Sequence, residues 1–207
     1  STGIKLKAAI FGGIKSLTNT MKQLREYKNI IRYLLARMIY TDGLNTLFAF
    51  GGIYAAGSFG FTFTELIQFG IAINLTSGIG AITFAWIDDW LGSKKTILIS
   101  LLALMVLSVL ILIIETKPLF WFFGLMLGIF VGPAQAASRS LMAHIAPPAL
   151  RTEMFGLYAF SGKVTAFLGP ATLAVVTDMF NSQRAGMATI VIFLALGAAI
   201  LLFVNDQ

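Results

Sequence analysis

The sequence predicts an all-α membrane protein with six membrane-crossing helices arranged as two repeats of three, preceded by an amphipathic helix at the membrane surface. Of the 207 residues, 57% are hydrophobic and only 12% are charged. This charged fraction is about half that of an ordinary soluble domain. The apolar residues gather into six stretches, each close to the ~20 residues that cross about 30 Å of hydrocarbon. One such stretch could be a soluble core, but six together indicate a membrane protein.

Residues 1–29 differ from the rest of the chain. Apolar residues recur there at steps of three and four, with lysines and arginines between them: Ile10, Ile14, Leu17, Met21 and Leu24. A basic amphipathic helix of this kind suits the headgroup layer of an anionic membrane face, and a solvated linker helix is the alternative. Because the chain begins with Ser1 and shows no signal peptide, we expect it to be part of a longer protein.

The membrane domain is expected over residues 30–207. Its six apolar stretches cover residues 30–56, 64–87, 96–114, 119–146, 154–177 and 185–204. They are long and lack alternating polarity, so they predict helices rather than barrel strands. Gly132-Pro133 and Gly169-Pro170 lie inside the fourth and fifth stretches, where a proline kinks a helix. Such kinks serve either a solute path or ordinary packing.

The positions of lysine and arginine predict the orientation. Lys94, Lys95, Arg151 and the basic residues before Ile30 fall on one side of the predicted membrane. The opposite side has Lys117 and Arg184 only. Lysine and arginine concentrate in cytoplasmic loops, so both termini are expected in the cytoplasm, with a bacterial inner membrane as the location. This placement also explains the net charge of +6 without a nucleic-acid partner.

Polar residues at depth occur in the first, second, fourth and fifth stretches, whereas the third and sixth contain no ionisable residue. A charge facing lipid at such depth costs about 3 kcal/mol or more, so these groups predict a shared water-accessible cavity. The period of three also predicts the three-plus-three repeat of half a secondary transporter, with the third and sixth helices facing lipid. The predicted cavity residues are Asp42, Asn45, Asn74, Gln135, Ser138, Arg139 and Lys163.

Asp42 is the candidate coupling carboxylate, because it lies twelve residues past Ile30, about 18 Å along a helix. It is expected either to exchange a proton or to form a static pair with Lys163 or Arg37. Asn45 shares its helical face. Lys163 is its cationic partner or a site for a substrate anion, and the fourth helix adds a polar stripe that comprises Gln135, Ser138 and Arg139.

The loop after the second stretch reads AWIDDWLGSKK over residues 85–95. It resembles the cytoplasmic loop motif of the major facilitator superfamily, glycine-x-leucine-alanine-aspartate-arginine-x-glycine-arginine-lysine. It departs from that motif at Ala85 and Trp90, where the motif has glycine and arginine. The resemblance implies a cytoplasmic gate, held by charge pairs and helix-end contacts, that comprises Asp88, Asp89, Gly92, Lys94 and Lys95.

Three further segments point to one branch of that superfamily. RMIYTDG at 37–43, GPAQAASRS at 132–140 and the segment 155–170 resemble the fungal vacuolar amino-acid exporters and their bacterial relatives. The resemblance covers about residue 29 to the end. It implies secondary transport of a small polar solute, with amino-acid efflux in the fungal members. It also implies an N-terminal six-helix half of the same protein as partner. A proton is the candidate coupling ion because Asp42 is titratable and lies at depth.

Other functions are disfavoured. The chain has no cysteine, one histidine (His144) and no G-x-S-x-G motif, so we expect no enzyme activity, catalytic residue, metal or cofactor. The segment from Gly156 to Lys163 only superficially resembles a nucleotide phosphate loop, because Val164 replaces the required serine or threonine. The remaining alternative is a self-sufficient six-helix protein that homodimerises as a channel or scaffold.

Overall fold

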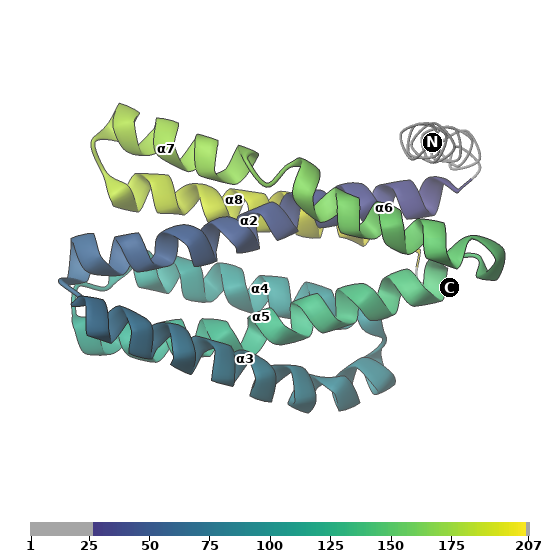
Figure 1. The fold of residues 1–207 in the computed structure, drawn as a ribbon, viewed down its shortest axis with the longest axis horizontal. Coiled ribbons are helices and arrows are strands. Elements are labelled where there is room, and N and C mark those ends of the chain that lie inside the picture. Colours follow the sequence, from purple (N-terminus) through teal and green to yellow (C-terminus); the bar gives the residue numbers. More distant parts are fainter. Residues whose placement is uncertain (1–26, 206–207) are drawn as a thin grey trace, which may run out of the picture.

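A computed structural model describes residues 27–205, and every regular element in that part of the chain is a helix (Figure 1). The all-α prediction is confirmed for these residues. The helices are α2 (Lys28–Phe59), α3 (Phe63–Leu91), α4 (Ser93–Ile113), α5 (Lys117–Ile145), the short 3₁₀ helix η1 (Pro148–Leu150), α6 (Arg151–Val164), α7 (Leu168–Phe180) and α8 (Gln183–Leu202). The amphipathic helix predicted for residues 1–29 lies outside the described residues, except for residues 27–29.

Five helical segments of the described chain are long and apolar enough to cross a membrane, by length and composition. They are α3, α4, α5, the segment Pro148–Phe180 that contains α6 and α7, and α8. The remaining predicted span, α2, has 32 residues and is about 48 Å long, more than a membrane crossing needs. It lies outside the apolar set, because charged residues occupy its first half and several glycines its second half.

The fifth predicted stretch is not one helix. The predicted span over 154–177 lies within the apolar segment Pro148–Phe180, and the disturbance expected at Gly169-Pro170 is a full break, because α6 ends at Val164 and α7 begins at Leu168. Pro170 accounts for the break: it has no N–H to donate to the carbonyl of Ala166, and its ring crowds that carbonyl. Pro170 itself lies in the first turn of α7, where a proline is tolerated. By contrast, Pro133 lies inside α5 without interrupting it.

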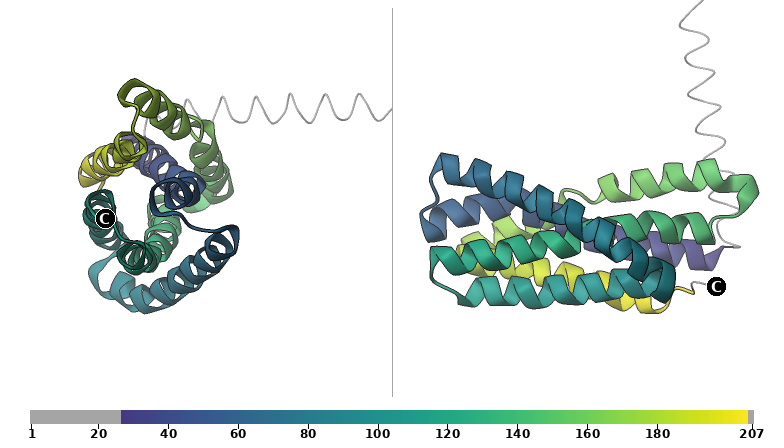
Figure 2. Two further views of the ribbon diagram at one scale, coloured as in Figure 1. Left: turned by 90° about the vertical axis from the view of Figure 1, so that its left-hand side faces the viewer. Right: turned by 90° about the horizontal axis from the view of Figure 1, so that it is seen from below.

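The helices form two groups that lie side by side (Figure 2). In one group α5 packs on both α3 and α4; in the other, α8 packs on both α2 and α7. The pairs α4–α8 and α2–α5 join the groups. The two ends of the described chain meet, because the side-chain amide of Asn29 exchanges hydrogen bonds of 2.6 and 2.7 Å with the backbone of Asn205.

Glycines allow the closest helix pairs to approach. Gly124, Gly128 and Gly132 recur every fourth residue on the face of α5 that meets α3. A Cβ atom at Gly132 would lie 2.0 Å from the carbonyl oxygen of Ser77, and one at Gly80 would lie 1.9 Å from that of Ile129. Pro133 supplies no N–H for the Ile129 carbonyl, and Gly80 packs directly against that oxygen. Small residues at such contacts are typical of membrane helices, where close packing replaces the hydrophobic effect.

Candidate functional site

The polar groups of the bundle converge on a cavity of about 470 Å³ between α2, α5 and α6, which we call the polar cavity. It brings together five of the seven predicted cavity residues: Asn45, Gln135, Ser138, Arg139 and Lys163. Its other lining residues are Arg37, Tyr40, Thr41, Leu44, Tyr158, Ala159, Gly162 and Ala166. These residues come from α2, α5 and α6 and from the segment after α6, and the other two predicted residues, Asp42 and Asn74, lie outside this cavity.

The contribution of α2 follows from its periodicity. Its five lining residues are spaced by three, four, seven and eight positions from the first, which places them on one helical face: Arg37, Tyr40, Thr41, Leu44 and Asn45. Our reading of the sequence missed Arg37 and Tyr40 as site residues. The spacing was the available signal, because Arg37, Thr41 and Asn45 recur every fourth residue and so lie on one face of the helix.

Arg37 is held against α6 by several contacts. Its Nη1 donates a hydrogen bond of 2.8 Å to Ser161 Oγ and a second one to the Tyr158 carbonyl. Its Cζ lies 3.5 Å from the centroid of the Tyr158 ring, a cation–π contact. The Nε atom is buried and has no hydrogen-bond partner among the described residues. The guanidinium is therefore fixed at the cavity wall by the α6 residues rather than paired with Asp42.

Ser138 is the point where α2 clamps α5. The hydroxyl of Tyr33 donates to the Ser138 carbonyl, and the hydroxyl of Tyr40 lies 2.7 Å from Ser138 Oγ. Both tyrosines are buried, with 0% and 1% of their surface exposed. Ser138 Oγ also donates to the carbonyl of Ala134, one turn back in α5. Ser138 therefore belongs to the wall that joins two helices, whereas Gln135 and Arg139 are the exposed groups of the predicted α5 stripe.

Replacing Tyr40 by phenylalanine is expected to loosen this clamp. The variant removes one hydroxyl and leaves the Ser138 hydroxyl without its cross-helix partner, which costs about 1 kcal/mol. For a chain of this size that corresponds to a fall of about 2–4 °C in unfolding temperature. Fluorescence-detected unfolding in detergent measures it. The control is Tyr27→Phe, outside α2 and far from the cavity, and an equal shift in both variants would contradict the assignment.

Asp42 points away from the polar cavity, toward the start of α7. It is 1% exposed, and its Oδ2 accepts a hydrogen bond of 2.8 Å from the backbone N–H of Gly169. Gly169 lies in the first turn of α7, so the carboxylate caps the half-helix that the Pro170 break creates. Its Oδ1 is buried without a hydrogen-bond partner among the described residues. The static pair with Lys163 or Arg37 is absent: within residues 27–205 Asp42 forms no ion pair.

The side chains of Asn45 and Asp42 therefore face different surroundings, although the two residues are one helical turn apart. Asn45 is exposed and lines the polar cavity. The residue that bonds to Asp42 is instead Thr46, whose hydroxyl donates a hydrogen bond of 2.8 Å to the backbone carbonyl of Asp42. Lys163 also lines the cavity; it occupies the last turn of α6, where the helix dipole stabilises a cation.

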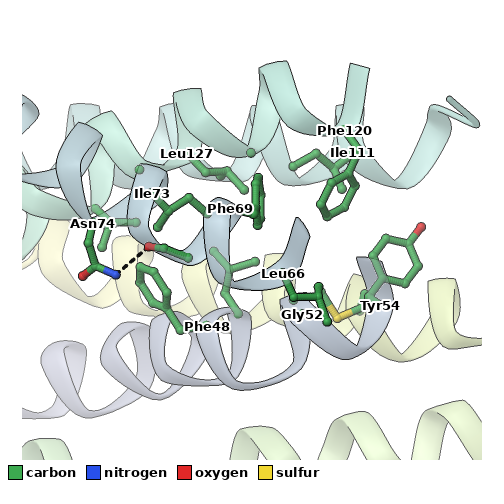
Figure 3. Close-up of a pocket in the computed structure, with 17 residues that line it drawn as sticks. Phe48, Gly52, Tyr54, Leu66, Phe69, Ile73, Asn74, Ile111, Phe120 and Leu127 are labelled. Carbon is green, nitrogen blue, oxygen red and sulfur yellow. Dashed lines mark hydrogen bonds between the residues drawn. The ribbon is translucent and has the colours of Figure 1, made fainter. Parts of the chain in front are cut away.

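Asn74 lies in a different, apolar cavity of about 210 Å³ between α2, α3 and α5 (Figure 3). Its side-chain amide donates a hydrogen bond of 2.8 Å to the carbonyl of Gly70 on its own helix. The surrounding side chains include Phe48, Phe69 and Leu127. Asn74 thus satisfies its own helix backbone, and the second predicted span contributes nothing to the lining of the polar cavity.

The predicted gate residues lie at the α3–α4 turn. Gly92 has φ +88°, a conformation that favours glycine, and its N–H closes α3 on the Asp88 carbonyl. The Lys94 Nζ donates a hydrogen bond of 3.1 Å to the Leu202 carbonyl at the end of α8, which is a helix-end contact of the predicted kind. Among the described residues Asp88, Asp89, Lys94 and Lys95 form no ion pair with one another. Asp88 Oδ1 is buried without a hydrogen-bond partner in that part of the chain.

Apolar helices closing around a polar cavity define a multi-pass membrane protein of the transporter class. The family model described as "Vacuole effluxer Atg22 like" matches residues 2–207, and the chain belongs to that family.

Its relatives agree with the superfamily resemblance. The chain is 25% identical over 198 residues to the protein of Bacillus subtilis named uncharacterized MFS-type transporter YxiO, covering 96% of this chain and 46% of that protein. It is 24% identical over 196 residues to autophagy-related protein 22 of Cryptococcus neoformans, covering 87% of this chain and 36% of that protein. The chain thus spans less than half the length of these relatives.

Proposed function

We propose that this chain is the C-terminal half of a twelve-helix carrier that moves a small polar solute across a membrane by alternating access. The observation that carries the proposal is the polar cavity: exposed Asn45, Gln135, Arg139 and Lys163 meet there, inside a bundle of apolar helices. Polar side chains at such depth are costly unless they pair with other polar groups or face a water-filled path, and the exposure of these four side chains in a cavity favours the path. In this proposal α2 also crosses the membrane, in addition to the five apolar segments, and its polar face is turned to the path.

The packing of the helices supports the three-plus-three arrangement. If α2, α3 and α4 correspond to α5, α6/α7 and α8, the contact of α2 with α8 corresponds to that of α5 with α4. The contact of α3 with α5 likewise corresponds to that of α6/α7 with α2. Two repeats that exchange contacts in this way are the building plan of many secondary transporters. The relatives' greater length supports a further six-helix half, rather than the alternative of a homodimeric channel.

The location and direction are also proposals. The described ends of the chain and the α3–α4 turn lie at one end of the bundle, as the contacts of Asn29 with Asn205 and of Lys94 with Leu202 indicate. That end carries Lys28, Arg32, Lys94, Lys95 and Arg151, so we assign it to the cytoplasm and the α3–α4 turn to a cytoplasmic gate. The family description as an effluxer supports export, and the resemblance to vacuolar exporters supports amino acids as the solute.

Asp42 is the proposed coupling group. A buried carboxylate whose one oxygen caps α7 and whose other oxygen has no partner among the described residues changes its contact with α7 when it takes up a proton. Such a change would alter the position of α7 relative to α6 at the break between them, because discontinuous helices form the moving parts of many carriers.

Counterflow of radiolabelled amino acids tests the proposed transport. Proteoliposomes of the complete protein, preloaded with an unlabelled amino acid, are expected to accumulate the labelled one transiently, and protein-free liposomes are not. Gln135→Leu, in the cavity, is expected to raise the half-saturating concentration about fivefold to tenfold through the loss of a hydrogen bond. Gln68→Leu, exposed on α3 outside that cavity, is the matched control. Equal effects of the two variants would refute the polar cavity as the solute path.

A further inference from the structure

The polar cavity carries three cations on three different helices. Arg37 belongs to α2, Arg139 to α5 and Lys163 to α6. None of the described residues that line this cavity is acidic. Its other polar groups are neutral at physiological pH, namely tyrosine, threonine, serine, asparagine and glutamine side chains. The lining of this half of the path is therefore positive.

The cations are not neutralised by the surrounding protein. Arg139 and Lys163 are exposed, and within residues 27–205 the side chain of neither has a hydrogen-bond or ion-pair partner. Arg37 is bound only to neutral groups, the Tyr158 carbonyl and ring and the Ser161 hydroxyl. The carboxylate of Asp42 faces the start of α7 and offsets one positive charge at most. Three like charges around one cavity repel each other, and a bound anion relieves that repulsion.

We infer that this cavity binds the anionic group of its solute, and that it favours solutes with a net negative charge, such as the acidic amino acids and other dicarboxylates, over neutral or cationic solutes of the same size. The Nη1 of Arg37 is engaged by Tyr158 and Ser161, so its Nη2 is the group of this fixed guanidinium that keeps N–H donors for a carboxylate, and Arg139 and Lys163 supply further positive charge from the facing helices. This inference rests on the proposed function for the identity of the polar cavity as the solute site.

The absence of cysteine in this chain permits a direct test of the charge. Ala159 lines the cavity and is exposed, so Ala159→Cys places a single thiol there. The variant is made in the complete protein, with any cysteine outside this chain replaced by serine. The thiol is modified by methanethiosulfonate reagents of opposite charge, the anionic ethylsulfonate and the cationic ethyltrimethylammonium. Ser58→Cys, exposed near the end of α2 and outside the polar cavity, is the control thiol.

Relative to the control thiol, Ala159→Cys is expected to react faster with the anionic reagent than with the cationic one, by about tenfold or more for three nearby cations. Arg139→Gln and Lys163→Gln together should remove most of this preference. Neither side chain forms a hydrogen bond or ion pair with another described residue, so the double variant is expected to fold. Its unfolding temperature checks this. Equal rates for both reagents, or a faster cationic reagent, would overturn the inference.

Protection experiments identify the ligand class. Succinate should slow modification of Ala159→Cys, whereas 1,4-diaminobutane, a dication of similar length, should not. Equal protection by the two, or none by succinate, contradicts the inference. In phosphatidylcholine vesicles no anionic lipid competes. If succinate has no effect there and added phosphatidylglycerol alone gives protection, the anion is a lipid headgroup and the solute assignment fails. Succinate protection without counterflow of any solute would leave the anion site standing and refute the proposed transport.

Discussion

Replacing Gly80 by alanine is expected to separate α3 from α5. The added Cβ atom would lie 1.9 Å from the carbonyl oxygen of Ile129 and 2.7 Å from its carbon, so one helix backbone must move. Overpacking of this kind costs about 1–3 kcal/mol. The expected fall in unfolding temperature is then about 2–4 °C for each kcal/mol. The loss should be large because Gly80 is one of the two buried residues of α3, with Phe69, and lies in the extensive α3–α5 contact. Thermal unfolding of the detergent-solubilised protein measures it.

The same helix contains a matched control. At Gly78, two residues away, an added Cβ atom would meet no heavy atom within 4 Å. Gly78→Ala is therefore expected to leave stability unchanged or to raise it by up to about 1 kcal/mol, since alanine favours the helix over glycine. If both variants lower the unfolding temperature equally, the close α3–α5 packing described here is wrong.

Replacing Asp42 by asparagine is expected to abolish transport driven by a pH gradient while leaving the fold intact. The asparagine carbonyl can still accept the hydrogen bond from the Gly169 N–H, so the cap on α7 is retained. What the variant loses is the group that takes up a proton. Uptake driven by a pH gradient should fall at least about tenfold, the effect of losing an essential ionisable group, whereas counterflow, which needs no net proton movement, should persist. Unchanged pH-driven uptake in the variant would exclude Asp42 as the coupling group.

A second substitution at Asp42 separates its structural role, the hydrogen bond to α7, from its proposed role in proton uptake. Asp42→Leu removes the acceptor and leaves the buried Gly169 N–H unsatisfied, which costs about 1–3 kcal/mol. It should lower the unfolding temperature and impair both pH-driven uptake and counterflow. Asp178→Asn, an exposed carboxylate near the end of α7, is the matched control and should change neither. Should Asp42→Leu prove as stable as Asp42→Asn, the hydrogen bond to α7 would not be the structural role of this residue.

Hydropathy alone located most of the helices, because each must fill the thickness of a membrane with apolar residues. The second predicted stretch, for example, covers 64–87 and the helix spans Phe63–Leu91. The fifth stretch shows the limit: its mean hydropathy is high enough for a membrane span, yet its helix breaks. The Gly169-Pro170 pair marked a disturbance there, but sequence could not distinguish a kink from a break. Pro133 has the same dipeptide context and stays inside a continuous helix.

The site residues divide in the same way. Asn45, Gln135, Arg139 and Lys163 could be predicted because a polar side chain at depth must find a polar surrounding. Asn74 met the same criterion and satisfies it differently, by bonding the Gly70 carbonyl one turn back. Depth and polarity therefore identify residues that need a partner, without identifying which partner they find.

The sequence by itself determined that this is a helical membrane protein, which end of each helix carries the basic residues, and that charged groups at depth must be sheltered. The tertiary structure alone decided that Arg37 is bound to Tyr158 and Ser161, that Ser138 joins α2 to α5, and that Asp42 caps α7. The physical reason is that burial depends on each residue's own chemistry, whereas a hydrogen-bond partner depends on which helices pack together. Here glycine contacts allow the closest helix pairs to approach.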